Sequence, residues 1–161
     1  MSVSVRRLSP DDWKAWRDLR LAALNESPEV FQGDQHQAGE HDEAVWRERL
    51  DPDAGLWALA SVDAEPVGQV GAWLPFGPPP TLVSLWVRPT WRGSGAGDAL
   101  VEAVLDWARE QSHPSVELWV MESNEPAKRL YRRHGFVSTG KTMPCPDVAE
   151  QEELMICQLG R

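Results

Sequence analysis

The chain has 161 residues, of which 42% are apolar and 25% charged, and its formal net charge is −9. These values predict a single domain, residues 1–161, which buries about two-thirds of the surface that its unfolded chain would expose. The negative charge argues against a sequence-independent hold on DNA or RNA, because such binding needs a basic face, and it favours a cationic partner.

The first half of the chain alternates between helical and extended patterns. Residues 3–9 alternate like a strand, and the cap-type residues Ser9 to Asp12 then predict a helix from Trp13 to about Asn25. Further runs predict, in chain order, a helix at 43–50 and strands at 55–62, 66–75 and 81–87.

A glycine-rich turn, Arg92 to Gly97, opens the second half of the chain. It lies between the strand ended by Pro89 and a helix from Asp98, whose apolar positions recur at helical spacing. A strand at 115–121, a helix at 125–135 and strands at 136–141 and 152–159 follow. This order predicts a mixed α/β fold with a strand, a turn and a helix at its centre.

The chain contains nine tryptophans but one tyrosine. Six of the tryptophans fall in amphipathic or apolar runs and are interpreted as core residues: Trp13, Trp16, Trp46, Trp86, Trp107 and Trp119. Trp73, beside a proline-rich loop, is the one that we expect near a ligand.

Targeting and metal signals are not found in the sequence. No run approaches the roughly 20 apolar residues of a membrane span, and the first residues lack the apolar core of a signal peptide, so we expect a cytoplasmic protein without a membrane partner. Cys145 and Cys157 lie outside any CxxC pattern and are interpreted as reduced thiols. The four histidines show no ligand spacing with one another or with the cysteines, so no metal site is expected.

The glycine turn does not match the common nucleotide or nucleophile motifs. A dinucleotide fingerprint needs glycine where Asp98 or Leu100 stands, a P-loop needs Gly-Lys-Ser/Thr, and a nucleophile elbow needs a small residue at Arg92. Glycines before a helix leave backbone N–H groups uncovered, and these donors together with the helix dipole favour an anion. We therefore expect a phosphate here, with a plain tight turn as the alternative.

Two motifs in this half resemble the GNAT N-acetyltransferase family. The stretch VRPTWRGSGAGDAL is similar to the family's acetyl-CoA signature, Arg/Gln-x-x-Gly-x-Gly/Ala, at Arg92, Gly95 and Gly97. A second element, Asn-x-x-Ala-x-x-x-Tyr-x-x-x-Gly-Phe, is matched by five residues: Asn124, Ala127, Tyr131, Gly135 and Phe136. The resemblance implies a mixed, mostly antiparallel central sheet flanked by helices, with a splay between strands 4 and 5.

The resemblance also implies an acetyl-CoA site. The amides of the turn would cradle the CoA pyrophosphate: Arg92, Gly93, Ser94, Gly95, Ala96, Gly97 and Asp98. Along the fourth strand, Leu85, Trp86 and Val87 would contact the cofactor, with the Leu85 N–H directed at the acetyl carbonyl. Asn124 would hold the cofactor from the fifth strand, and Tyr131 would protonate the leaving thiolate. A packed aromatic on a helix face is the alternative for Tyr131.

The general base is not supplied by the family's usual positions. Relatives carry a strand glutamate where this chain has Thr81 or Trp119. Glu122 is the carboxylate nearest to the splay in the sequence, although strand alternation puts it on the opposite face from Trp119. Glu40, Glu43 or a water chain are the alternatives.

The acceptor is expected to be a cationic amine, either a small molecule or a protein amine. In the family, the segments 25–42 and 141–153 cover the acceptor, and here both are rich in carboxylates. The resemblance allows a homodimer, but no apolar stripe demands one. The predicted function is direct acetyl transfer to a primary amine in a ternary complex, and the alternative is a non-catalytic acyl-CoA-binding sensor. A dinucleotide-dependent enzyme would require the glycine spacing that is missing.

Overall fold

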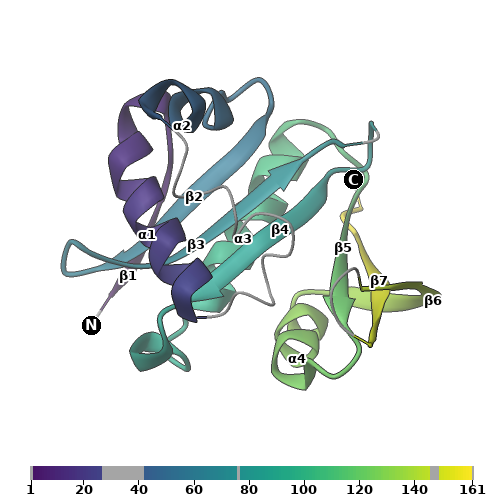
Figure 1. The fold of residues 1–161 in the computed structure, drawn as a ribbon. Helices are drawn as coiled ribbons and strands as arrows, with labels where there is room; N and C mark the ends of the chain where they lie inside the picture. The colour runs from purple at the N-terminus through teal and green to yellow at the C-terminus, as the bar shows by residue number, and fades with distance from the viewer. Residues whose placement is uncertain (1, 27–41, 76, 146–148, 161) are drawn as a thin grey trace.

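The computed structural model describes residues 2–26, 42–75, 77–145 and 149–160. These residues form one seven-stranded sheet with helices on both faces (Figure 1). The elements are, in chain order, β1 (Val3–Arg7), α1 (Trp13–Glu26), α2 (Glu43–Arg49), β2 (Gly55–Val62), β3 (Glu65–Trp73), β4 (Thr81–Val87), α3 (Ala96–Glu110), β5 (Ser115–Met121), α4 (Glu125–Arg133), β6 (Phe136–Pro144) and β7 (Gln151–Gln158).

The predicted elements are confirmed, with differences at their ends. A capping box between Ser9 and Asp12 precedes α1, as the cap-type residues predicted. Helix α3 begins at Ala96, two residues before the predicted start, because Gly95 in the left-handed region serves as its N-cap. Strand β6 extends to Pro144, so residues 142–144, which were expected in a loop, pair with β7 instead.

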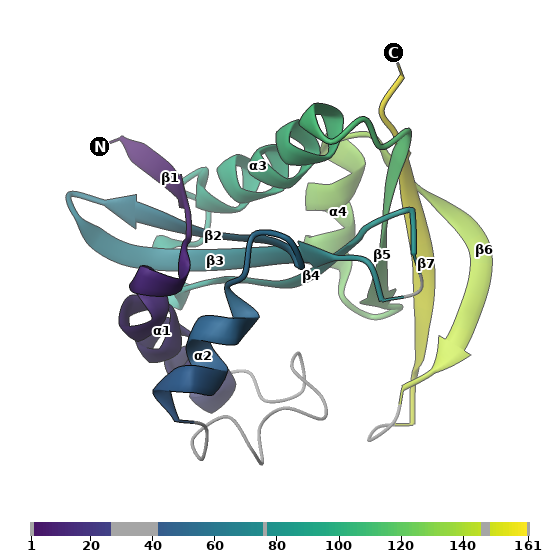
Figure 2. The ribbon, with the colours of Figure 1, turned by 90° about the horizontal axis from the view of Figure 1, so that it is seen from above.

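The strand order of the sheet is β1-β2-β3-β4-β5-β7-β6. Neighbouring strands are antiparallel except β4 and β5, which run parallel and share one registered pair, Thr81 with Glu117. Beyond that pair the two strands diverge (Figure 2). The predicted mostly antiparallel sheet with a splay between strands 4 and 5 is therefore confirmed.

A bulge in β4 changes which face of the sheet its side chains reach. Ser84 has a φ of 58°, and the register with β3 shifts between Gln69 and Gly71. Leu82 packs in the core cluster that includes α3, whereas Trp86 packs in the cluster under α1 and α2. Residues four apart in a regular strand share a face, so the bulge at Ser84 reverses the alternation.

The two faces of the sheet carry separate apolar cores. Helices α1 and α2 cover one face and α3 covers the other, with α4 beside β5 on the α3 side (Figure 2). Trp16 and Trp46 are buried under α1 and α2, where their rings meet edge to face at 5.2 Å between centroids. Truncating a fully buried tryptophan to alanine typically costs about 3–5 kcal/mol, so this small layer is a major part of the fold's stability.

Most of the tryptophans predicted as core are buried. Trp86 and Trp107 are buried in addition to Trp16 and Trp46. Trp13 and Trp119 are half-buried instead, Trp13 packing at the edge of the α1 core. The amphipathic pattern thus predicted the buried faces of the helices correctly. It was less reliable for Trp119, which lies on β5 beside the opening in the sheet.

A polar clamp joins α3 to α4. The His134 ring lies 2.8 Å from an Asp98 carboxylate oxygen and 2.6 Å from a Glu102 oxygen, and Arg133 also donates to Asp98 at 3.0 Å. Burial raises the pKa of Asp98, but the hydrogen bonds from His134 and Arg133 more than offset this and lower the pKa below its usual value. The clamp fixes α4 against the first turns of α3.

Replacing Asp98 with asparagine should therefore reduce stability in a pH-dependent way. Because the pKa of Asp98 is lowered in the folded state, its contribution is present above the usual value of 3.8 and is lost as the pH falls through the folded value. We expect Asp98→Asn to lower the free energy of unfolding by at most about 1 kcal/mol near neutral pH, since the carboxylate is partly exposed.

Urea unfolding at neutral and acidic pH measures this difference. Asp106→Asn is the matched control, because Asp106 is an exposed carboxylate of the same helix, paired only with Arg109 three residues later among the described residues. An Asp98→Asn effect that does not shrink in acid would contradict the clamp.

Candidate active site

The glycine turn leaves its backbone open at the start of α3. Gly93 and Gly95 have φ values of 83° and 95°, and a Cβ atom on either would meet nothing within 4 Å. Gly97 differs, because a Cβ there would lie 3.2 Å from the Leu130 side chain, where α3 approaches α4. The first turn of a helix has no intrahelical acceptors for its N–H groups, and the helix dipole adds partial positive charge. The turn thus combines several open N–H donors with free space, which suits a phosphate.

Arg92 fixes this turn to β4 and α1. Its Nε donates to the Val87 carbonyl at 3.0 Å, and a terminal nitrogen donates to the Glu26 carboxylate at 3.1 Å. Glu26 also accepts a hydrogen bond of 2.8 Å from the Trp86 indole. The Ser94 hydroxyl is turned inward to the Trp91 carbonyl. The Ser94 N–H donates to the Trp91 carbonyl at 3.3 Å and the Ala96 N–H to the Ser94 hydroxyl at 3.4 Å. Within the described chain, the N–H groups of Gly93, Gly95, Gly97 and Asp98 are the ones in this turn that remain open.

The opening between β4 and β5 exposes a strand edge beside the turn. Beyond Thr81 no described residue of β5 is in register with β4. The Leu85 and Val87 side chains pack against the core that includes α3, while Trp86 points to the other face. The main chain of Leu85 to Val87 therefore borders the opening, and an unpaired strand edge is a ready site for an extended ligand with amide groups.

Tyr131 lies on α4 with its ring buried. The ring meets Phe136 at 5.8 Å between centroids, and the hydroxyl has no hydrogen bond to any residue that the structure describes. Burial raises the pKa of this hydroxyl well above its usual value. A phenol in this state keeps its proton at neutral pH and can donate it.

Asn124 serves as the N-cap of α4. Its side-chain oxygen accepts a hydrogen bond of 3.3 Å from the Ala127 N–H. The side-chain NH₂ group keeps its donor capacity at the end of β5. The sequence motif therefore marks a helix cap as well as the position predicted to hold a cofactor.

Glu122 lies in the turn after β5, and its side chain is exposed. Its carbonyl accepts a hydrogen bond of 2.8 Å from Lys128, which is buried and also pairs with Glu125 and Glu153. Glu150 accepts a hydrogen bond from the Ser123 N–H. Two carboxylates of the segment 141–153 thus lock α4 and β5 to β7. The predicted acidic segment 25–42 lies mostly outside the described residues, and Glu40 with it.

Glu117 is a carboxylate that the sequence reasoning missed. It is registered with Thr81 across the parallel pair, and Thr81 is in turn registered with Trp73 of β3. Val116 and Leu118 point into the core that includes α3, so alternation puts Glu117 on the face that carries α1 and α2. Trp119 lies two residues further along the strand and therefore shares this face. The sequence alone could thus have placed Glu117 on the same face as Trp119.

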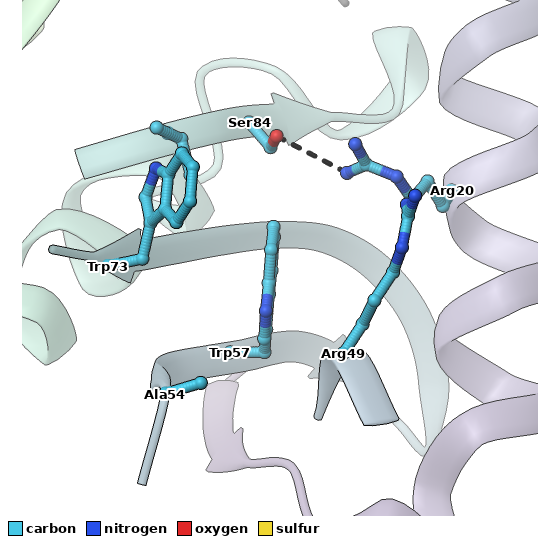
Figure 3. Close-up of a pocket in the computed structure, with 7 residues that line it drawn as sticks. Arg20, Arg49, Ala54, Trp57, Trp73 and Ser84 are labelled. Carbon is cyan, nitrogen blue, oxygen red and sulfur yellow. Dashed lines mark hydrogen bonds between the residues drawn. The ribbon is translucent and has the colours of Figure 1, made fainter. Parts of the chain in front are cut away.

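A cavity of about 480 Å³ lies on the same face, under α1 and α2 (Figure 3). Its described lining comes from five elements and the loop before β2: Arg20, Arg49, Ala54, Trp57, Trp73, Val83 and Ser84. Trp73, predicted near a ligand, is part of it. The arginines and Trp57 were not predicted. For Arg20 a signal was present in the sequence, because it follows Trp16 by four residues and therefore lies on the same, apolar face of α1.

Other types of site find no support among the described residues. No three or more His, Cys, Asp or Glu side chains in that part of the chain gather in an arrangement that could hold a metal ion. Cys145 and Cys157 are both buried, and neither forms a disulfide within the described part of the chain. None of the helices described is long and apolar enough to cross a membrane.

Two acetyltransferases are similar to this chain in sequence. Mycothiol acetyltransferase from Thermobifida fusca is 36% identical over 107 residues, 66% of this chain and 27% of that protein. N-acetyltransferase 8B from Rattus norvegicus is 37% identical over 100 residues, 58% of this chain and 44% of that protein. The chain thus spans less than half the length of these relatives.

Two solved structures have the same fold at low sequence identity. One is yncA from Salmonella typhimurium, solved with its cofactor acetyl-CoA, with a TM-score of 0.79, 17% identity and coverage of 100% and 96% of the two chains. The other is ribosomal-protein-alanine N-acetyltransferase from Brucella melitensis, with a TM-score of 0.78, 20% identity and coverage of 97% and 99%. A family model for the acetyltransferase (GNAT) family matches residues 13–136. With the turn, the splay and the α4 motif in their expected order, this match shows that the chain belongs to the GNAT acetyltransferase family.

Proposed function

We propose that this protein transfers an acetyl group from acetyl-CoA to a primary amine, with both substrates bound at once. The observation that carries the proposal is the open glycine turn at the start of α3, placed beside the free edge of β4. It is supported by the membership of the GNAT family and by a fold neighbour solved with acetyl-CoA.

The residues present fit this donor. The open N–H groups of Gly93, Gly95, Gly97 and Asp98 suit the pyrophosphate, and the edge from Leu85 to Val87 suits the amide-bearing arm. The Asn124 NH₂ group is a further donor at the end of β5. When bound, acetyl-CoA supplies an acetyl thioester as the electrophile.

Two groups of the chain act on the reacting atoms. The Leu85 N–H stabilises negative charge that develops on the acetyl oxygen as the amine nitrogen attacks. The protonated Tyr131 hydroxyl donates its proton to the sulfur as the carbon–sulfur bond breaks. The amine nitrogen gains the new carbon bond and loses its proton to a base.

Glu117 is the base that the geometry favours, acting directly or through water. It shares a face with the cavity lining, whereas the predicted base, Glu122, is exposed in the turn after β5. The position of Thr81, where relatives carry a glutamate, is the neighbour of Glu117 across the sheet. This register supports Glu117 as the carboxylate that takes the role of the missing one.

Removing the Tyr131 hydroxyl should separate binding from chemistry. We expect Tyr131→Phe to lower kcat by about 10²-fold, because the leaving thiolate loses its proton donor. The affinity for acetyl-CoA and the Tm should change little, because the hydroxyl makes no hydrogen bond to a described residue. Thiol release over a panel of amines gives the rates, and calorimetry gives the affinity.

The panel also distinguishes an enzyme from an acyl-CoA sensor. A sensor would bind acetyl-CoA with either residue at position 131 and would release no thiol with any amine. Failure of the wild-type protein to bind acetyl-CoA would overturn the assignment of the glycine turn itself.

Substitution of Gly95 tests the turn directly. Gly95→Ala adds a Cβ in the open space above the amides and forces an L residue to a φ of 95°. Gly140→Ala is the matched control, since its φ of 85° and open surroundings are similar but it lies in β6. Both variants should lose roughly 1–2 kcal/mol of stability. Only Gly95→Ala should weaken acetyl-CoA binding, by about 10-fold, and equal affinities would contradict the proposed turn.

Two glutamine variants decide between the candidate bases. Glu117→Gln should lower kcat by about 10²-fold near neutral pH, with a smaller loss at high pH where the amine is already neutral. Glu122→Gln is the control, because it removes the same negative charge at the exposed Glu122. It should leave the pH profile of kcat unaltered. The reverse result would return the role to Glu122.

A further inference from the structure

A row of paired residues crosses the sheet from the cavity to the edge strand β6. Trp73 of β3 is registered with Thr81 of β4, and Thr81 with Glu117 of β5. Glu117 is in turn registered with Ile156 of β7, which pairs with Val137 of β6. Directly paired residues share a face of a sheet, so these five side chains lie on the face that carries α1 and α2. The row joins the aromatic lining of the cavity to the carboxylate of Glu117.

Glu117 brings a negative charge to this row. Its side chain is half-buried, and its carboxylate forms no ion pair or hydrogen bond with any residue that the structure describes. Carboxylates nearby differ in this respect, since Glu26 pairs with Arg92 and Glu153 with the buried Lys128. A partly desolvated carboxylate is stabilised by a cation placed against it. The ammonium group of a ligand fits this position, beside the opening between β4 and β5.

Two tryptophan rings give the cavity an apolar lining. The Trp57 ring lies against the main chain of β3, because Gly71 has no side chain and a Cβ there would lie 2.4 Å from the ring. Trp16 contacts the same ring at 4.8 Å between centroids, so packing fixes its position. Trp73 is 49% exposed, a high value for a large apolar side chain. An apolar group that covers these rings would gain binding free energy from the surface it removes from water.

The Trp73 end of the cavity leads toward Glu117. Figure 3 shows the Trp57 ring between Arg20 and Arg49 on one side and Trp73 on the other. Beyond Trp73, the row continues through the neighbouring strand to Glu117. Two strand spacings, about 10 Å, separate the main chains of Trp73 and Glu117. A ligand that contacts both side chains therefore needs an apolar body and a cation joined by a short link.

We propose that the acceptor is a primary amine that carries an aromatic ring on a short alkyl link, a class that phenethylamine represents. Its ring packs against Trp57 and Trp73 in the cavity of about 480 Å³, and its ammonium pairs with Glu117. The ammonium loses one proton to Glu117 before the nitrogen attacks the acetyl carbon and a second to solvent after the new bond forms, while the thiol leaves with the proton of Tyr131. This assignment rests on the proposed acetyl transfer and adds the class of its substrate.

Three matched acceptors test the apolar body: phenethylamine, propylamine and 1,4-diaminobutane. Each carries the ammonium that Glu117 would bind, so the ring is what distinguishes the first from the others. We expect kcat/KM for phenethylamine to exceed that for the other two by about 10²-fold, because its ring alone covers the tryptophans.

Trp73→Ala tests the aromatic wall without relying on a buried residue. It should reduce the preference for phenethylamine over propylamine by about 10-fold and leave the affinity for acetyl-CoA unchanged. Val137→Ala is the matched control, because Val137 is 59% exposed and lies in the same row, on the other side of Glu117. It should leave the preference unaltered. Thiol release gives kcat/KM for each acceptor, and calorimetry gives the affinity for acetyl-CoA.

The outcomes separate the two levels of the proposal. If propylamine or 1,4-diaminobutane reacts as well as phenethylamine, or if Val137→Ala reduces the preference as much as Trp73→Ala does, the assigned substrate class is overturned while acetyl transfer stands. If acetyl-CoA binds but neither these acceptors nor the amine panel releases thiol, the transfer activity itself fails.

Discussion

A single strained residue in β4 sets the geometry on which both sides of the candidate site depend. Ser84 occupies the left-handed region at a φ of 58°, which costs roughly 1–2 kcal/mol for a residue with a Cβ. Two neighbours hold it there, because Arg20 donates to its hydroxyl and the buried Gln69 donates to its carbonyl at 3.3 Å. Strain that is fixed in this way is typical of functional sites.

The bulge has consequences on both faces of the sheet. Before it, Val83 lines the cavity; after it, Leu85 and Val87 pack toward α3 and leave their main chain along the opening. One irregular residue therefore places the cavity and the edge proposed for the donor side by side. A regular strand would have continued to pair or would have turned these groups to the wrong face.

The acidic residues of this protein are largely used to hold helices in place. Asp98 and Glu102 clamp α4, Glu26 secures the glycine turn through Arg92, and Glu153 pairs with the buried Lys128. These carboxylates face cations of their own chain. The open N–H groups of the turn consequently remain a site of positive potential in a chain whose net charge is −9.

The sequence by itself determined the elements and the donor motifs, because helical and strand periodicity and the positions of glycines are local properties. Spacing picked out the turn from Arg92 to Gly97, and the resemblance to the GNAT family added Tyr131 and Asn124. Only the tertiary structure decided what lines the cavity beside the candidate site. Arg20, Trp57 and Trp73 come from separate elements, and Glu117 meets Thr81 through a parallel register that no local pattern encodes. The bulge at Ser84 also reverses strand alternation, so the faces of β4 could not be assigned by counting residues.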